Sequence, residues 1–289
     1  MIPGSFDYSA PSTLEEAISL LQQHGDEAKI LSGGHSLIPM MKLRLASPGH
    51  VIDINRIPDL DYINEEEGFL KIGALVRESD LEESDLIRTK YQVIYDATKM
   101  IADPSVRNVA TVAGNLAHGD AANDHPAVML ALGADLIATG PNGTRTIPIT
   151  EFFQGFFTTA LEADEILTEI RIPVPPANSS GTYLKLERKV GDYATAGVAV
   201  QLTLDAQATC THAGIGLTNV GDMPIEAVAA EQALIGQKLD DERLKTAAQL
   251  ASDASDPMPD LRGSTEYKKN MVRVLTYRAL KQVIEQILS

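Results

Sequence analysis

Apolar and polar positions alternate in helix-like and strand-like patterns over the first 176 residues. Apolar residues recur at helical spacing over 14–21, and Thr13 and Glu16 form a capping box before them. Short apolar runs between turn residues predict strands, and a mostly helical stretch covers 81–100. The predicted strands are residues 28–31, 51–54, 69–75, 134–139, 145–149 and 166–172. This order of helices and strands predicts an α/β arrangement.

The pattern changes after a run rich in proline, serine and glycine. Residues 173–181 read PVPPANSSG, a composition typical of a boundary between domains. Beyond it, the spacing predicts three strands suited to an antiparallel meander, followed by three helices. These elements are predicted at 182–188, 194–204, 208–217, 226–235, 241–252 and 264–288. We therefore expect two domains, residues 1–176 and residues 177–289.

Composition narrows the classes of partner. The chain of 289 residues has 24 basic and 40 acidic residues, a net charge of −16, which disfavours nucleic acid and anionic membrane surfaces as partners. Cys210 is the single cysteine, so the chain has no internal disulfide and no cysteine-bound iron–sulfur cluster or zinc. No apolar run approaches the roughly 18 residues of a membrane helix, and the N-terminus has no signal-peptide pattern. We expect a cytoplasmic protein.

Two short stretches combine glycine with small polar residues. The first is SGGHS at 32–36, directly after a predicted strand, and the second is TVAGN at 111–115. Backbone N–H groups beside glycine can approach an anion closely because no Cβ intervenes. Neither stretch is a GxGxxG fingerprint or a P-loop, and a plain tight turn explains the first one equally well. Two such loops in one domain nevertheless favour a dinucleotide whose pyrophosphate lies between them.

The segment HGDAANDH at 118–125 admits a second interpretation. His118, Asp120, Asp124 and His125 are metal-ligating residue types within eight positions, but their spacing matches no known zinc motif. A loop that caps the helix predicted from about Pro126 is the simpler explanation.

A third candidate is KLERKVGDYATA at 185–196. Tyr193 leaves a turn at 191–192 and enters a strand of small residues, where its ring is placed to stack on a flat ligand. The alternative is a hairpin tip with a half-buried tyrosine.

Four motifs in one order resemble a known family. They are SGGHSLIPMMKLRLA, TVAGNLAHGD, IRIPVP and KVGDYATA. Together they resemble the FAD-binding medium subunit of the molybdenum hydroxylases, with the medium chain of aerobic carbon monoxide dehydrogenase as the closest branch. The resemblance implies an α+β fold with two domains. The FAD-binding domain would contain two α/β subdomains, at about 1–56 and 57–176, and would have the fold type of vanillyl-alcohol oxidase (PCMH). The C-terminal domain would contain a three-stranded antiparallel sheet with a helical bundle.

The resemblance also implies an FAD site, with the pyrophosphate between the two glycine loops and the flavin near Tyr193. The implied cofactor-binding residues are Ser32, Gly33, Gly34, His35, Ser36, Leu37, Ile101, Ala102, Thr111, Ala113, Gly114, Asn115, Asp124, Leu167, Lys185 and Tyr193. Two positions depart from the usual family loops, because Ser32 replaces an alanine and Ala113 replaces a glycine. A methyl group at 113 fits if φ is negative, and a positive φ would require the loop to shift.

The implied function is electron transfer through FAD, with no catalytic acid, base, nucleophile or metal in this chain. A large subunit would carry the molybdenum cofactor and a small subunit the 2Fe–2S clusters, in a dimer of heterotrimers. An external acceptor, for which a quinone is one candidate, would take the electrons. The alternatives are the medium subunit of a nicotine, aldehyde or purine (xanthine) enzyme, a non-redox nucleotide-binding protein, and a metal-dependent hydrolase built on His118, Asp120, Asp124 and His125.

Overall fold

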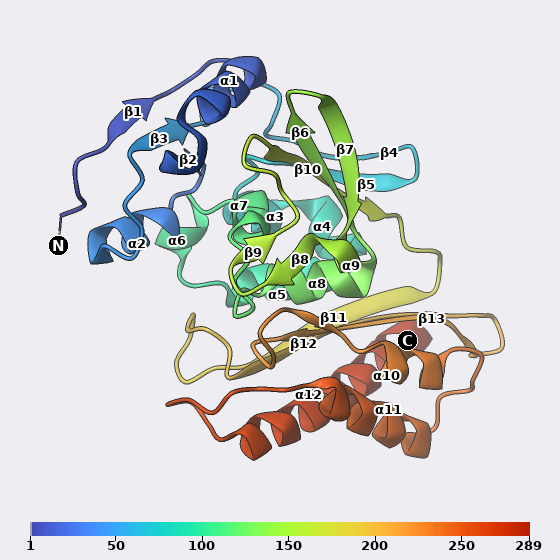
Figure 1. Cartoon of the computed structure of the whole chain (residues 1–289). Coiled ribbons are helices and arrows are strands. Elements are labelled where there is room, and N and C mark those ends of the chain that lie inside the picture. Colours follow the sequence, from blue (N-terminus) through green and yellow to red (C-terminus); the bar gives the residue numbers. More distant parts are fainter. Residues whose placement is uncertain (1) are drawn as a thin grey trace.

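The computed structural model describes residues 2–289 and contains three sheets of three or more strands (Figure 1). The first sheet is parallel and has the order β1-β3-β2, with β1 at Asp7–Ser9, β2 at Ala28–Leu31 and β3 at His50–Asp53. Its crossovers contain α1 (Leu14–His24) and α2 (Leu37–Leu43), because parallel strands cannot be joined by a tight turn. These elements form the N-terminal lobe. The apolar stripe of α1 lies in the core of this lobe, as its spacing predicted.

The central lobe is built on a five-stranded antiparallel sheet of order β4-β5-β10-β6-β7. Its strands are β4 (Ile63–Glu66), β5 (Phe69–Gly73), β6 (Asp135–Gly140), β7 (Gly143–Pro148) and β10 (Ile166–Pro173). Its helices are α3 (Glu78–Glu83), α4 (Asp85–Lys90), α5 (Gln92–Met100), α6 (Pro104–Arg107), α7 (Val112–Ala117), α8 (His125–Leu132) and α9 (Ile149–Phe152). A small hairpin joins β8 (Phe153–Gly155) to β9 (Thr158–Thr159).

The stretch 81–100, predicted as mostly helical, is three short helices rather than one. Ser84 ends α3 in an extended conformation, and its hydroxyl accepts a hydrogen bond from the N–H of Ile87 at the start of α4. Serine competes with the helical backbone in this way and therefore favours a helix terminus over a helix interior. The hairpin predicted around residues 141–143 is confirmed as β6 and β7.

The C-terminal lobe contains an antiparallel sheet of order β11-β12-β13-β14. The three long strands are β11 (Ser179–Leu186), β12 (Ala196–Leu204) and β13 (Cys210–Thr218), and they confirm the predicted meander. A two-residue strand that the sequence did not predict, β14 (Ile225–Glu226), adds a fourth. The predicted helices are confirmed as α10 (Val228–Leu234), α11 (Asp241–Ala254) and α12 (Thr265–Leu288).

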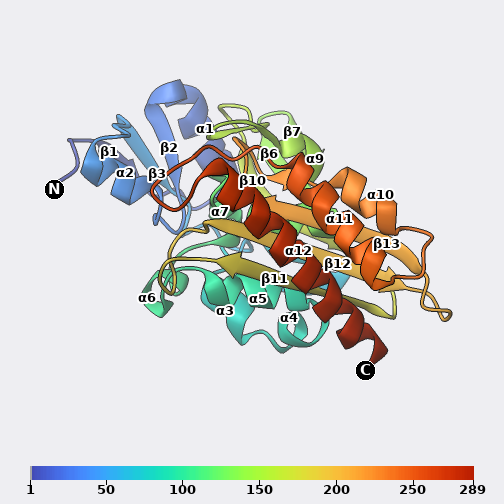
Figure 2. The same cartoon turned by 90° about the horizontal axis from the view of Figure 1, so that it is seen from below.

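Both faces of this last sheet are covered. α10, α11 and α12 lie on one face, and α5 and α8 of the central lobe lie on the other (Figures 1 and 2). Every residue of β12 is buried as a result. A Cβ at Gly214 or Gly216 would collide with carbonyl oxygens of α8, so this helix rests on the bare backbone of β13. Across residues 2–289, no helix is both long enough and apolar enough to span a membrane.

Candidate cofactor-binding site

A cavity of about 760 Å³ lies where the three lobes meet. Its wall comes from the loop after β2, from residues 101–124, from the β8–β9 hairpin and the segment after it, and from Lys185 and the loop 191–193. Sites for small molecules and cofactors are typically concave and span roughly 300–1,000 Å³. The cavity therefore has the size of a cofactor site.

The two glycine loops touch at the cavity wall, backbone against backbone. A Cβ on Gly33 would lie 2.7 Å from the Cα of Ala110 and 2.8 Å from the backbone nitrogen of Thr111. Glycine is therefore required at position 33 by the opposite loop. Gly34 has φ +73°, a conformation that side chains rarely adopt. The first loop is thus shaped by both of its glycines.

Side-chain and backbone groups complete the contact between the loops. The hydroxyl oxygens of Ser32 and Thr111 lie 2.9 Å apart in a hydrogen bond. Thr111 is also the N-cap of α7, where its hydroxyl accepts from the N–H of Gly114 at 3.3 Å. Within residues 2–289, the N–H groups of 33–36 donate no hydrogen bond to a protein acceptor. They are donors available to a ligand, as in an anion-binding nest.

Ala113 is accommodated without a shift of the second loop. It is the second residue of α7, where φ is negative, and its side chain is buried. The methyl group points toward a smaller pocket of about 80 Å³, which Leu167 also lines. The concern that a methyl at this position would distort the loop therefore does not apply.

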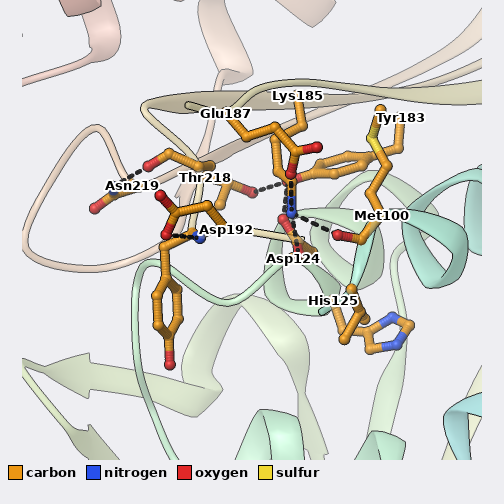
Figure 3. Close-up of polar contacts among 12 residues, drawn as sticks. Met100, Asp124, His125, Tyr183, Lys185, Glu187, Asp192, Thr218 and Asn219 are labelled. Atoms are coloured by element: carbon orange, nitrogen blue, oxygen red, sulfur yellow. Dashed lines mark hydrogen bonds and ion pairs between the residues drawn. The ribbon is translucent and has the colours of Figure 1, made fainter. Parts of the chain in front are cut away.

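Asp124 and Lys185 line the cavity and belong to a buried polar cluster (Figure 3). The ammonium group of Lys185 contacts Asp124 Oδ2 at 2.9 Å and donates to the carbonyl oxygen of Met100 at 2.8 Å. Tyr183 donates to Asp124 Oδ1 at 2.6 Å, and Glu187 lies 3.5 Å from Lys185. Burial raises the pKa of Asp124, while Lys185 and Tyr183 act in the opposite direction. The cluster fixes both charged groups in place.

The loop that carries Tyr193 is held against the segment after α5. Gly191 has φ +78°, and a Cβ there would overlap the carbonyl group of Ala102, which itself has φ +46°. Asp192 is paired with Arg188 at 2.9 Å and contacts Arg262 at 3.3 Å. Tyr193 lines the cavity and is 48% exposed. Its ring is accessible to a ligand in the cavity.

Most residues that the resemblance implied line this one cavity. They are Ser32, Gly33, Gly34, His35, Ser36, Leu37, Ile101, Ala102, Thr111, Gly114, Asn115, Asp124, Lys185 and Tyr193. Ala113 and Leu167 line the smaller pocket instead, beside Ser32 and Gly114. The sequence reasoning missed Tyr183 and the carbonyl of Met100. Tyr183 lies two residues before Lys185 on a strand, and this period of two could have placed both side chains on one face.

The residues of the alternative metal site do not converge. His125 Nε2 lies 2.7 Å from Glu78 Oε2, and both side chains are fully buried away from solvent. Asp124 is occupied by Lys185 and Tyr183. In the described part of the chain, no three histidine, cysteine, aspartate or glutamate residues are grouped as a metal would require. The hydrolase alternative therefore has no assembled site.

Comparison with known proteins identifies the family. The family model described as the FAD binding domain in molybdopterin dehydrogenase matches residues 4–175, and the CO dehydrogenase flavoprotein C-terminal domain matches residues 181–283. The chain is 44% identical to the carbon monoxide dehydrogenase medium chain of Hydrogenophaga pseudoflava, with 97% of each chain covered. It is 37% identical to the glyceraldehyde dehydrogenase medium chain of Sulfolobus acidocaldarius, covering 98% of this chain and all of that one.

A solved structure is similar over the same length. The carbon monoxide dehydrogenase of Hydrogenophaga pseudoflava that lacks the Mo-pyranopterin moiety aligns with a TM-score of 0.95 and 46% identity, covering 98% of each chain. The predicted family and fold class are thereby confirmed. The chain belongs to the FAD-binding medium subunits of the molybdopterin dehydrogenases, the molybdenum hydroxylases.

Proposed function

We propose that this chain holds FAD and transfers electrons as the medium subunit of an aerobic carbon monoxide dehydrogenase. The observation that carries the proposal is the meeting of the two glycine loops at one cavity wall, where the backbone N–H groups of 33–36 donate to no acceptor in residues 2–289. The similarity to a carbon monoxide dehydrogenase medium chain favours this enzyme over the other members of the family.

The residues at the first end of the cavity fit a diphosphate. The close approach of Gly33 to Ala110 leaves no room for a Cβ, and the N–H groups of 33–36 are without protein acceptors. Charged oxygens accept hydrogen bonds from such donors more strongly than neutral ones do. We therefore place the pyrophosphate of FAD against Ser32–Ser36 and Thr111–Asn115.

The residues at the second end would orient the flavin. FAD, when bound, supplies the redox chemistry. The chain supplies Tyr193 as an accessible aromatic surface and the Asp124–Lys185 pair as fixed charges at the wall. The same placement assigns Leu37, Ile101, Ala102, Ala113 and Leu167 to the packing around the cofactor. No acid, base or nucleophile of this chain is needed for electron transfer.

The partner subunits are those that would carry the cofactors this chain does not hold. Burial raises the pKa of the Cys210 thiol to about 11, so the single cysteine is an inert core residue. Iron–sulfur clusters must therefore come from a small 2Fe–2S subunit, and the molybdenum cofactor from a large subunit. We propose a cytoplasmic dimer of heterotrimers that passes electrons to an external acceptor such as a quinone. We further place the boundary between the FAD-binding domain and the C-terminal domain at residue 176, between β10 and β11.

Anaerobic addition of carbon monoxide to the purified complex of all three subunits tests this function. We expect carbon monoxide to bleach the visible flavin absorption. Bleaching by glyceraldehyde or nicotine, with no response to carbon monoxide, would assign the chain to another member of the family. A complex that contains no flavin would contradict the proposal altogether and favour the non-redox alternative.

A further inference from the structure

A polar bridge outside the cavity connects the first glycine loop with the segment that leads into the second. Asn55 lies two residues after β3, in the N-terminal lobe. Its side-chain amide donates to the carbonyl oxygen of Ser32 at 3.0 Å and to Asp53 Oδ1 at 2.6 Å. One end of the bridge is therefore attached to the first glycine loop.

Arg77 attaches the other end to the segment that leads into the second loop. One guanidinium nitrogen, Nη2, donates to Asn55 Oδ1 at 2.5 Å, and the other, Nη1, donates to the carbonyl oxygen of Val109 at 2.5 Å. The backbone of Arg77 also forms an antiparallel β-bridge with Thr111. Asp80 Oδ2 accepts from the N–H of Arg77 at 2.7 Å and fixes this residue at the start of α3.

The two attachment points flank the closest contact between the loops. Ser32 precedes Gly33, and Val109 precedes the Ala110 backbone against which Gly33 rests. The bridge spans two lobes, because Asn55 follows a strand of the N-terminal sheet and Arg77 follows a strand of the central sheet. A change in its length would therefore change the separation of the two sets of backbone donors.

The bridge is better suited to positioning than to holding the fold together. Its hydrogen bonds are exposed, and exposed polar pairs contribute little to global stability. Neither Asn55 nor Arg77 lines the cavity, so neither contacts a ligand in it. Holding a site in its bound geometry nevertheless improves affinity, because less ordering is needed when the ligand binds.

We propose that Asn55 and Arg77 are positioning residues that set the spacing of the two loops for the diphosphate of FAD. This inference rests on the proposed function, because it assumes that the loops hold that diphosphate. It predicts that the binding affinity of ligands with a diphosphate depends on the bridge, whereas that of a flavin without a diphosphate does not.

The test compares three ligands on the three-subunit complex after its flavin has been removed. FAD carries flavin and diphosphate, ADP carries only the diphosphate, and riboflavin carries only the flavin. The variants are Asn55→Ala, Arg77→Met, Arg77→Lys and the double variant Asn55→Ala/Arg77→Met. A matched control is the exposed Arg273–Asn270 pair on α12, whose Nη2 to Oδ1 distance is 2.8 Å, changed to Arg273→Met and Asn270→Ala.

We expect Asn55→Ala and Arg77→Met each to weaken FAD and ADP about tenfold, which corresponds to about 1.4 kcal/mol. Riboflavin binding should change less than about twofold, and Arg77→Lys should recover part of the loss because it keeps a donor. The double variant should be little worse than either single one, because both break the same bridge. The control variants should leave all three affinities unchanged.

Two results would overturn the inference. One is that the bridge variants bind FAD with the same affinity as the wild-type complex. The other is an equal loss for riboflavin, which would indicate general damage to the fold. A wild-type complex that binds ADP and riboflavin but refuses FAD, or binds none of the three, would instead contradict the proposed function and the inference with it.

Discussion

The hydroxyl oxygens of Ser32 and Thr111 lie 2.9 Å apart and join two loops that are 79 residues apart in the sequence. Alanine at position 32 would remove this hydrogen bond, because it has no hydroxyl group. Thr111 has a second role, because its hydroxyl also caps α7. The two residues of the pair should therefore respond differently to substitution.

Ser32→Ala should have a small effect and Thr111→Val a larger one. The first removes one partly buried hydrogen bond, worth about 1 kcal/mol. The second also removes an N-cap, which adds about 1 kcal/mol to the loss of unfolding free energy. Urea unfolding of both variants measures the difference. Equal losses would show that the cap to Gly114 contributes nothing.

Gly33→Ala should reduce FAD affinity by at least about tenfold. The added methyl would meet the backbone of Ala110 and Thr111, which cannot rotate away as a side chain would, and the loops would have to separate. Gly4→Ala is the matched control, because a Cβ there meets nothing within 4 Å. Titration of flavin-free complexes with FAD gives both affinities. Unchanged affinity in Gly33→Ala would place the pyrophosphate elsewhere.

Removing one partner of the buried Lys185–Asp124 pair should lower the free energy of unfolding more than removing both. Lys185→Met leaves Asp124 as an unpaired buried carboxylate and should lower the unfolding free energy by about 3–5 kcal/mol. The double variant Lys185→Met/Asp124→Asn should recover much of this loss. Thermal unfolding of the single and double variants checks the prediction, and a double variant as unstable as the sum of both singles would contradict it.

The Glu78–His125 pair predicts a dependence of stability on pH. Burial of the imidazole favours its neutral form, but the carboxylates of Glu78 and Asp124 together outweigh burial and raise the pKa of His125. A raised histidine pKa stabilises the fold fully below the unfolded value of about 6.5, and this contribution is lost as the pH rises through the folded value. The unfolding free energy should therefore fall above about pH 6.5.

Glu78→Gln provides the comparison for this pair. It removes one of the two charges that raise the pKa of His125, so the variant should lack this decline and be less stable than the wild type at pH 6. Urea unfolding between about pH 6 and pH 9 measures both curves. Parallel curves for the two proteins would show that His125 does not titrate in this way.

Ionisation of the buried Glu231 carboxyl should lower the stability of the fold. Burial raises its pKa from 4.5 to about 7, although its carboxylate accepts from the N–H of Ile215 at 2.7 Å. A raised carboxyl pKa means that stability falls as the pH rises from the unfolded value through the folded one. Glu231→Gln keeps the acceptor and should be more stable than the wild type at pH 8, by roughly 1–3 kcal/mol. The gain should vanish near pH 4.5, and a gain of equal size at both pH values would exclude titration as its cause.

Local sequence patterns predicted most elements of the fold, and the exceptions have physical causes. The strand at Ala28–Leu31 and the long helix Thr265–Leu288 were both predicted, because their apolar spacing and flanking residues agree. The first break in the stretch 81–100 comes from the capping Ser84, a local hydrogen bond that apolar spacing does not reveal, and the second lies at Tyr91.

The site was less predictable than the fold because its contacts join distant segments. The glycine loops and their pairing around a pyrophosphate were proposed from the residues, but FAD as the ligand depended on the resemblance to a family. Tyr183 reaches Asp124 across 59 residues, and Arg77 reaches Val109 across 32, so no local spacing predicts either contact. The alternative metal site is not assembled, since folding brings Glu78 to His125 and Lys185 to Asp124.

The flavin content of the purified complex shows whether the two glycine loops hold FAD. After acid release, the cofactor can be separated, identified and counted against this chain. We expect one FAD per chain, and a large loss of FAD when Gly33 is replaced by alanine. A wild-type complex without FAD, or full FAD content in Gly33→Ala, would contradict the claim that these two loops hold the cofactor.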